Sequence, residues 1–175
     1  AFINELAVLC ESAGADAAEV EQGMKSDVRI GPGAYVKPGA AFAGGTLARD
    51  IGYLVGLGEG SGKPTHLFAG VRKSNEAHKR WASHKLEELL GKLAGKKVAV
   101  LGLTYKPGTD TLRCSEAVVL CRWLAEQGAV IRAFDPAVAA LPRDLGFRMR
   151  LESSMTETVR GAEALVLCTP WPQFR

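Results

Sequence analysis

The sequence lacks the features that would assign it to several specialised classes of protein. No apolar run approaches the roughly 20 residues that a membrane-spanning helix needs, and no segment resembles a signal peptide. The 22 Lys and Arg only slightly outnumber the 19 Asp and Glu, and no run of like charges stands out. A nucleic-acid tail is therefore not indicated. We expect a cytoplasmic protein that binds neither membranes nor nucleic acids.

Motifs for metal and dinucleotide binding are also missing. The four cysteines are widely spaced and form no C-x-x-C pair, which favours buried, reduced thiols over a zinc or redox site. The three histidines lack metal-ligand spacing, so we expect no metal. A G-x-G-x-x-G fingerprint is absent, because Gly102 stands alone after an apolar run.

The first half of the chain has helical periodicity. Apolar residues recur at helical spacing from Phe2 to Ala13 and stop at Gly14, and Asp16 with Glu19 has the form of a capping box for a second helix. Thr46 is expected to cap a third helix that runs to Val55 and is closed by the glycine-rich stretch 56–62, and a long helix is expected over 65–90.

Between these helices, residues 28–45 are rich in glycine and proline and show no period, which predicts a long irregular loop. Loops of this length in compact domains are usually functional. The long helix after it has an apolar stripe that turns polar in the middle, around Asn75 and His78. His78 is expected either to pack within that stripe or to line a ligand cleft.

After residue 92 the pattern changes to apolar runs that alternate with helical segments. Strands are expected at 98–103, 130–134, 147–151 and 164–168, with helices at 113–127 and 155–160. Such alternation predicts a doubly wound, mostly parallel sheet. We therefore expect an α/β chain, with a central helical domain at 1–92 and a Rossmann-like domain at 93–175.

Ligands of open α/β sheets bind beyond the carboxyl ends of the strands. Lys106 and Arg113 flank the turn after the first strand, where a helix N-terminus favours anions. They can contact a phosphate or carboxylate, or be solvated surface cations. Asp135, which follows the second strand, can bind a ribose hydroxyl or, because Pro136 comes next, serve as a turn residue.

A series of motifs in this chain resembles the nucleotide-sugar dehydrogenases of the UDP-glucose/GDP-mannose type. The similar segments follow one another in the order found in that family and cover essentially the whole chain. They are Phe2–Glu5, Leu9–Glu11, Asp27–Gly31, Phe42–Asp50, Leu103–Pro107 with Thr109, Asp110 and Arg113, Phe134–Pro136, and Ala164–Thr169 with Trp171 and Phe174.

The resemblance implies an enzyme that oxidises the C6 alcohol of a UDP- or GDP-linked sugar to a carboxylate in two hydride transfers to NAD. In that family an N-terminal Rossmann domain binds NAD, central helices form a homodimer, and a C-terminal Rossmann-like domain binds the nucleotide end of the sugar. This chain would hold the central domain and most of the C-terminal domain, and the NAD-binding domain would be absent from it.

The resemblance also implies roles for individual residues on the sugar side. Asp50 corresponds to the aspartate that positions or deprotonates a catalytic water. Arg29 corresponds to the arginine that reaches the substrate of the neighbouring subunit. Phe42 and Gly44 belong to the glycine-rich loop around the sugar, and Lys106 matches a lysine that contacts the sugar.

On the cofactor side, the resemblance implies that Arg49 and Arg113 face the NAD pyrophosphate. The sequence departs from the family at Thr46, which stands where the family has its catalytic cysteine. A thiol is partly ionised near neutral pH and traps an aldehyde readily, whereas a threonine hydroxyl needs a strong base beside it. Cys114 and Ala48 also replace the usual glutamate and proline.

Three hypotheses follow. The leading one is an NAD-linked oxidoreductase acting on a nucleotide sugar, altered or stalled at the aldehyde, whose activity needs the full-length protein. The second is a non-catalytic module for nucleotide-sugar binding or dimerisation. The third is an unrelated Rossmann-like domain with a helical arm.

Overall fold

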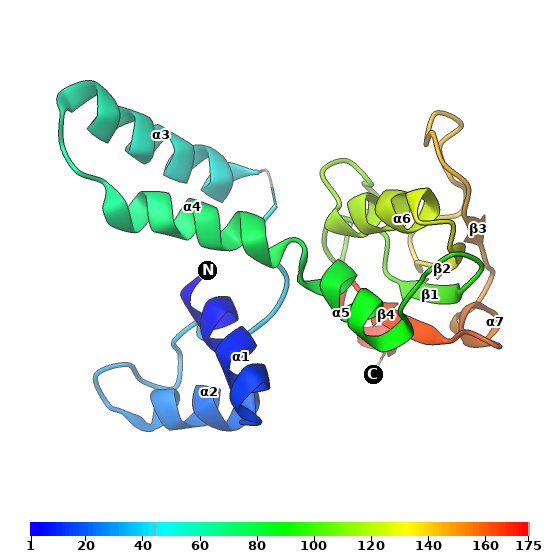
Figure 1. Ribbon diagram of the computed structural model, residues 1–175, viewed down its shortest axis with the longest axis horizontal. Helices are drawn as coiled ribbons and strands as arrows, with labels where there is room; N and C mark the ends of the chain where they lie inside the picture. The colour runs from blue at the N-terminus through cyan, green and yellow to red at the C-terminus, as the bar shows by residue number, and fades with distance from the viewer. Residues whose placement is uncertain (44, 175) are drawn as a thin grey trace. The chain divides into compact units, whose positions relative to one another are not determined.

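The computed structural model describes residues 1–43 and 45–174 of the chain. It divides into two compact units, Ala1–Lys79 and Arg80–Arg175, whose elements are shown in Figure 1. The division falls between Lys79 and Arg80, so the helical segment 81–90 belongs to the second unit, whereas the sequence placed it with the first.

The first two helices begin and end where local signals predict. Helix α1 spans Phe2–Ala13 and ends at Gly14, whose φ of 68° is left-handed and suits glycine. Helix α2 spans Ala17–Ser26, and the Asp16 carboxylate accepts a hydrogen bond from the Ala18 N–H at 2.7 Å. Asp16 is therefore the predicted N-cap.

Helices α3 (Thr46–Ser61) and α4 (His66–His78) lie side by side as a hairpin (Figure 1). Helix α3 is longer than predicted, because it continues through the glycine-rich stretch and ends at Gly62. Gly58 explains part of this: it is buried, and a Cβ there would collide with Thr65. The glycine thus lets the α3–α4 turn pack closely against the last turns of α3.

The single helix predicted over 65–90 is wrong. Helix α4 ends at His78, and helix α5 begins at Trp81 and runs to Leu90. Between them Arg80 has φ −90° and ψ −2°, which lies in the bridge region next to helical geometry. Neither glycine nor proline occurs at this point, so the sequence carries no local signal for the interruption.

The second unit contains a four-stranded parallel sheet of order β3-β2-β1-β4. The observed strands agree with the predicted ones, although β3 is reduced to two residues. Their bounds, with those of the intervening helices, are β1 Lys97–Leu101, α6 Glu116–Glu126, β2 Val130–Phe134, β3 Arg150–Leu151, α7 Met155–Val159, β4 Ala164–Leu167 and the 3₁₀ turn η1 Pro172–Phe174.

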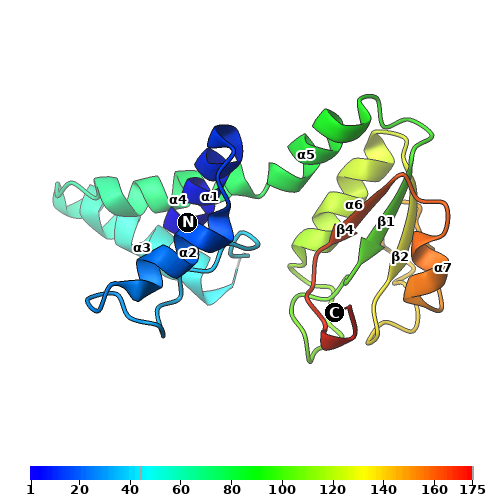
Figure 2. The ribbon, with the colours of Figure 1, turned by 90° about the horizontal axis from the view of Figure 1, so that it is seen from below.

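Helices cover both faces of this sheet, with α6 and α7 on opposite sides (Figure 2). Helix α5 packs against α6 and β4, while α7 packs on β1 and β2. The core between α6 and the sheet includes the fully buried Val98, Val100, Cys121 and Leu124. The predicted doubly wound, Rossmann-like α/β architecture is confirmed. In the described part of the chain, no helix is both long and apolar enough to span a membrane.

Candidate functional site

The loop predicted over residues 28–45 is irregular, and side chains of α1 and α4 fix its second half. Asn4 of α1, 6% exposed, donates to the Ala40 carbonyl at 3.3 Å and accepts from the Gly39 N–H at 3.0 Å. His78 Nε2 of α4 lies 2.9 Å from the Gly39 carbonyl. His78 therefore anchors the loop.

Asn75 makes a second anchor three residues before His78. Its side chain is 1% exposed. It accepts a hydrogen bond from the Phe42 N–H at 2.9 Å and donates one to the Phe42 carbonyl at 2.8 Å. The polar middle of the predicted α4 stripe thus serves to hold the glycine-rich loop. Gly44, the other residue assigned to the sugar-binding part of this loop, lies outside the described residues.

The start of α3 carries three of the assigned residues. Gly45, not Thr46, is the N-cap, and Thr46 is the first helical residue with an exposed side chain. The predicted capping role of Thr46 is therefore wrong, because Thr46 is already part of the helix and the N-cap is the residue before it. Thr46 and Asp50 are four residues apart in one helix and so share a face.

The Asp50 carboxylate is engaged by its neighbour. Its Oδ1 accepts from Arg49 Nε at 3.1 Å and from the terminal nitrogen Nη2 of Arg49 at 3.0 Å. Both side chains are more than half exposed, so water screens this pair and it contributes little stability. The Thr46 side chain, one turn before Asp50, is exposed.

Arg29 lies on a tight turn at the start of the same loop. The Ile30 and Gly31 N–H groups donate to the Asp27 carbonyl at 3.0 and 2.8 Å. The Arg29 guanidinium binds the Asp27 carboxylate, with a closest distance of 2.6 Å, and this contact lowers the pKa of Asp27. With its side chain 85% exposed, Arg29 can exchange this partner for another anion.

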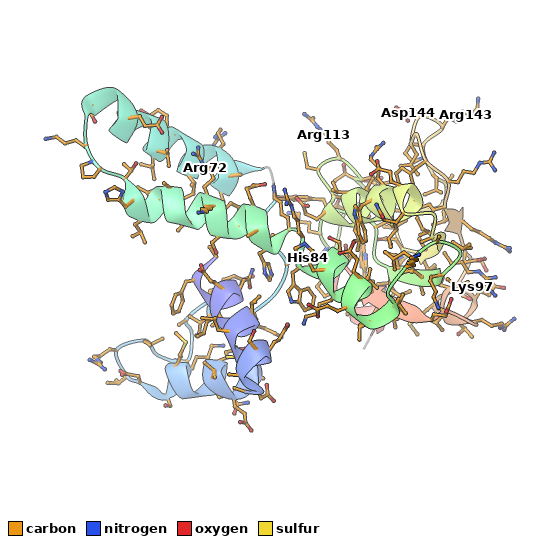
Figure 3. The ribbon with its side chains drawn as sticks, in the orientation of Figure 1. Arg72, His84, Lys97, Arg113, Arg143 and Asp144 are labelled. Carbon is orange, nitrogen blue, oxygen red and sulfur yellow. The ribbon has the colours of Figure 1, made fainter. Side chains whose placement is uncertain are left out.

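Lys106 and Arg113 lie on the loop that connects β1 to α6, and both are exposed. The Tyr105 N–H donates to the Thr111 carbonyl at 2.9 Å, which closes the loop on itself. Figure 3 shows Arg113 projecting outward from this loop. Helix α6 begins only at Glu116, later than predicted, so Arg113 precedes the helix instead of forming its first turn.

Asp135 holds the start of the same loop through hydrogen bonds. Its carboxylate is 2% exposed and accepts from the Leu103 and Thr104 N–H groups at 2.7 and 2.9 Å. It also accepts from the Thr104 hydroxyl, the Trp171 indole N–H at 3.1 Å and the Ala137 N–H. Both oxygens are thus committed to the protein itself, which favours the turn interpretation over a ribose contact.

Gly102 and Thr169 pack closely together where the strand order reverses, between β1 and β4. Gly102 at the end of β1 has φ 85°, and a Cβ there would lie 2.5 to 2.6 Å from atoms of Thr169. The Thr169 hydroxyl donates to the Thr104 carbonyl at 2.6 Å. In Figure 2 the turn η1 lies at the same edge of the sheet as the loop after β1. The absence of a side chain at Gly102 therefore lets Thr169 pack directly against the end of β1.

An open depression of about 400 Å³ lies at the carboxyl ends of β2 and β3, lined by residues 134–139 and 151–153. Glu152 on its wall is 8% exposed, and its Oε1 lies 3.0 Å from Arg150 Nε and 3.5 Å from Arg132 Nε. Glu152 is paired with the two arginines, and both Asp135 oxygens accept hydrogen bonds from the protein, so we assign the depression no ligand.

The cysteines are not all buried as predicted. Burial raises the pKa of Cys168 to about 12 and raises that of Cys121 as well, so both thiols are unreactive. Cys10 is also buried. Cys114, however, is exposed and has a left-handed φ of 58°. In the described residues, no group of three His, Cys, Asp or Glu side chains could hold a metal ion.

The assigned residues are distributed over the two units. Those of the glycine-rich loop and of α3 belong to the first unit, and Lys106 and Arg113 belong to the second. The sequence did not identify Asn4 and Asn75 as the residues that hold the loop. The change from apolar to polar residues in the α4 stripe was the available signal for Asn75.

A helical unit followed by a doubly wound parallel sheet with cations on its loops defines an α/β protein of the Rossmann-like class. Within this class, the chain belongs to the UDP-glucose/GDP-mannose dehydrogenase family. Residues 1–77 match the central domain of the family, and residues 99–175 match its UDP binding domain. The matches in both halves exclude an unrelated Rossmann-like domain with a helical arm.

Individual relatives agree with this. The UDP-glucose 6-dehydrogenase of Pseudomonas aeruginosa is 36% identical over 181 residues, which cover 99% of this chain and 40% of that protein. A UDP-glucose dehydrogenase from Pyrobaculum islandicum superposes with a TM-score of 0.86 at 32% identity, covering 99% of this chain and 40% of that one.

A UDP-D-ManNAc dehydrogenase from Pyrococcus horikoshii has a TM-score of 0.76 at 28% identity, covering 99% of this chain and 38% of that one. The chain thus spans about 40% of the length of the relatives that it matches.

Proposed function

We propose that this chain supplies the central and UDP-binding parts of an NAD-dependent dehydrogenase, which oxidises the C6 alcohol of a UDP- or GDP-linked sugar. The observation that carries the proposal is the ordered match of both domains, residues 1–77 and 99–175. The full-length protein would act as a cytoplasmic homodimer that associates through its central helices.

In this proposal the first unit surrounds the sugar. Phe42 and Gly44 line the loop around it, Asp50 orients a water, and Arg29 reaches the substrate of the neighbouring subunit. Support comes from the hydrogen bonds by which Asn75 holds the loop at Phe42. The exposure of Arg29 also supports it, because it leaves the guanidinium available to an anion. Lys106 would contact the sugar from a loop of the second unit.

NAD would accept the hydride in each oxidation. The sequence has no G-x-G-x-x-G fingerprint for a dinucleotide, since Gly102 stands alone after β1. We propose that a further domain of the full-length protein holds the cofactor. Arg49 and Arg113, both exposed, would approach only its pyrophosphate.

Thr46 sets the chemistry apart. The first oxidation removes a hydride and a proton from the C6 alcohol and leaves an aldehyde. A second oxidation requires that a nucleophile, a thiolate or water, adds to this aldehyde before another hydride leaves; a thioester formed through a thiolate is then hydrolysed by water to the carboxylate. Because a threonine hydroxyl, unlike a thiol, is not appreciably ionised near neutral pH, we expect the reaction to stop at the aldehyde or to continue through its hydrate, formed by a water at Asp50.

The same observation supports the alternative of a non-catalytic module that binds nucleotide sugars. To separate the two, we would add UDP-glucose and NAD to the full-length protein and follow NADH. Two equivalents per sugar indicate complete oxidation, one indicates arrest at the aldehyde, and none, together with measurable UDP-glucose binding, supports the module.

The Thr46→Cys variant tests what the replaced residue does. If only the nucleophile has been lost, this variant should raise the NADH yield from one equivalent to two, or from none to two. Thr46→Ser, which restores no thiol, is the matched control and should behave like the parent. An inactive Thr46→Cys variant that still binds UDP-glucose would favour the binding module.

A further inference from the structure

Asn75 is an unusual residue for its position. Asparagine is a weak helix former because its side chain competes for backbone hydrogen bonds, and a buried amide is costly unless it is satisfied. Asn75 nevertheless lies in the interior of α4 with 1% exposure. Both halves of its amide are satisfied by a residue 33 positions away, through the Phe42 N–H and carbonyl.

This arrangement resembles one rung of a β-ladder, in which the side chain of Asn75 replaces a neighbouring strand. Bonding both backbone groups of Phe42 fixes the orientation of that residue as well as its position. Thr46 lies only four positions after Phe42, a span of at most about 14 Å at roughly 3.5 Å per residue. The orientation of Phe42 therefore constrains the glycine-rich segment that enters α3.

Asn4 makes the same pair of contacts, but at the base of the loop. Its side chain accepts from the Gly39 N–H and donates to the Ala40 carbonyl, two residues that lie farther from the start of α3 than Phe42 does. The loop thus has two amide anchors of similar burial and identical chemistry, and only one of them acts directly on a residue assigned to the sugar.

We propose that Asn75 is a positioning residue, which holds the Phe42 end of the loop in the conformation that receives a nucleotide sugar. This inference rests on the proposed function. Asn75 does not touch the substrate and acts through Phe42. Asn4, in contrast, secures the fold of the loop without setting the geometry of its substrate-facing end.

The test compares Asn75→Asp with Asn4→Asp in the full-length protein. Aspartate keeps the shape and one acceptor at each position but cannot donate to the loop carbonyl while ionised. Steady-state kinetics with UDP-glucose and NAD are measured at a temperature where circular dichroism shows both variants folded. The parent is the wild type, or Thr46→Cys if only that protein turns over.

For Asn75→Asp we expect kcat/KM for UDP-glucose to fall by about 10- to 100-fold, since small misplacements of substrate-positioning groups have effects of this size. The KM for NAD should change less than about twofold. For Asn4→Asp, at a comparable loss of thermal stability, kcat/KM for UDP-glucose should stay within about threefold of the parent. If Asn75→Asp does not fold, Asn75→Ser, which keeps a donor, replaces it.

Equal kinetic effects of the two variants, or wild-type kinetics of folded Asn75→Asp, would overturn the positioning role and leave the proposed function intact. A parent without turnover contradicts the enzymatic proposal alone. In that case the same two variants are compared by UDP-glucose affinity in calorimetry, with the same expected order. A parent that neither turns over nor binds UDP-glucose overturns both.

Discussion

Replacing Asp135 with asparagine tests whether one buried carboxylate holds the carboxyl edge of the sheet together. Asp135 accepts five hydrogen bonds, four of them at Oδ2. Asparagine has the same shape, but one of its terminal atoms is a donor, so the four donors and the Ala137 N–H cannot all be satisfied. Hydrogen bonds to a charged group contribute about 1.5 to 3 kcal/mol, and an unsatisfied buried donor costs about 1 to 3 kcal/mol.

From these values we expect the free energy of unfolding of the second unit to fall by about 3 kcal/mol. For a domain of this size the loss corresponds to a decrease in Tm of roughly 10 to 20 °C. Urea and thermal unfolding, followed by circular dichroism and by tryptophan fluorescence, measure the effect. The exposed Asp144, at the loop before β3, supplies the control, because Asp144→Asn should change stability by less than about 0.5 kcal/mol.

The same variant should change how stability depends on pH. Burial raises the pKa of Asp135, but hydrogen bonds from Ala137, Thr104 and Leu103 outweigh it and leave the pKa below its usual value. A depressed carboxyl pKa stabilises the fold above the unfolded value of about 3.9, and this contribution is lost as the pH falls through the folded pKa. The difference in the free energy of unfolding between wild type and Asp135→Asn should therefore become smaller below about pH 4. A difference that does not change with pH, or equal stabilities at neutral pH, would refute the reasoning.

Three smaller predictions concern single positions. Gly102→Ala should lower the free energy of unfolding by about 3 kcal/mol, since its Cβ would meet Thr169 at a left-handed φ; a neutral result in urea unfolding would contradict the close contact. Cys114→Gly should raise it by about 1 kcal/mol, because the φ of 58° is strained for cysteine; lower stability would argue against strain. Arg49→Ala should change stability by less than about 1 kcal/mol, yet raise the KM for NAD in the full-length protein; an unchanged KM would remove Arg49 from the cofactor side.

Sequence patterns predicted the elements that depend on local signals. Helix α1 ends at Gly14 because glycine accepts the left-handed C-cap, and strand β2 coincides with the apolar run 130–134 that follows Gly128. Strong signals of this kind need no tertiary context. The order of elements, and with it the doubly wound sheet, followed from them.

Elements that depend on packing were predicted less well. Helix α3 continues through its glycines because its end packs tightly against the turn at Thr65, a contact that the sequence does not encode locally. The interruption at Arg80 has no glycine or proline to mark it. Strand β3 shortens to Arg150–Leu151, where it pairs with β2 at the edge of the sheet.

Within the candidate site, the residue types indicated what chemistry is possible, but they did not indicate which hydrogen-bond partner each side chain has. The sequence left Asp135 open between a ribose ligand and a turn, because its contact with Trp171 joins residues 36 positions apart. The polar gap in the α4 stripe was visible, but the partner of Asn75 was not. Hydrogen bonds between residues far apart in the sequence decide both cases, and local patterns in a single sequence do not reveal such bonds.

The loop after β1 links the stability of the second unit to ligand binding. In a sheet of this class the ligand approaches the carboxyl ends of the strands at the reversal of strand order, and this loop lies at that end. Lys106 is a cation on this loop that we assign to an anionic ligand. The position of Lys106 depends in turn on the loop that Asp135 bonds at Leu103 and Thr104, only two residues earlier. Stability and binding at this edge should consequently decline together when Asp135 is changed, whereas a ligand seated directly on the strand ends would be far less sensitive to the loop.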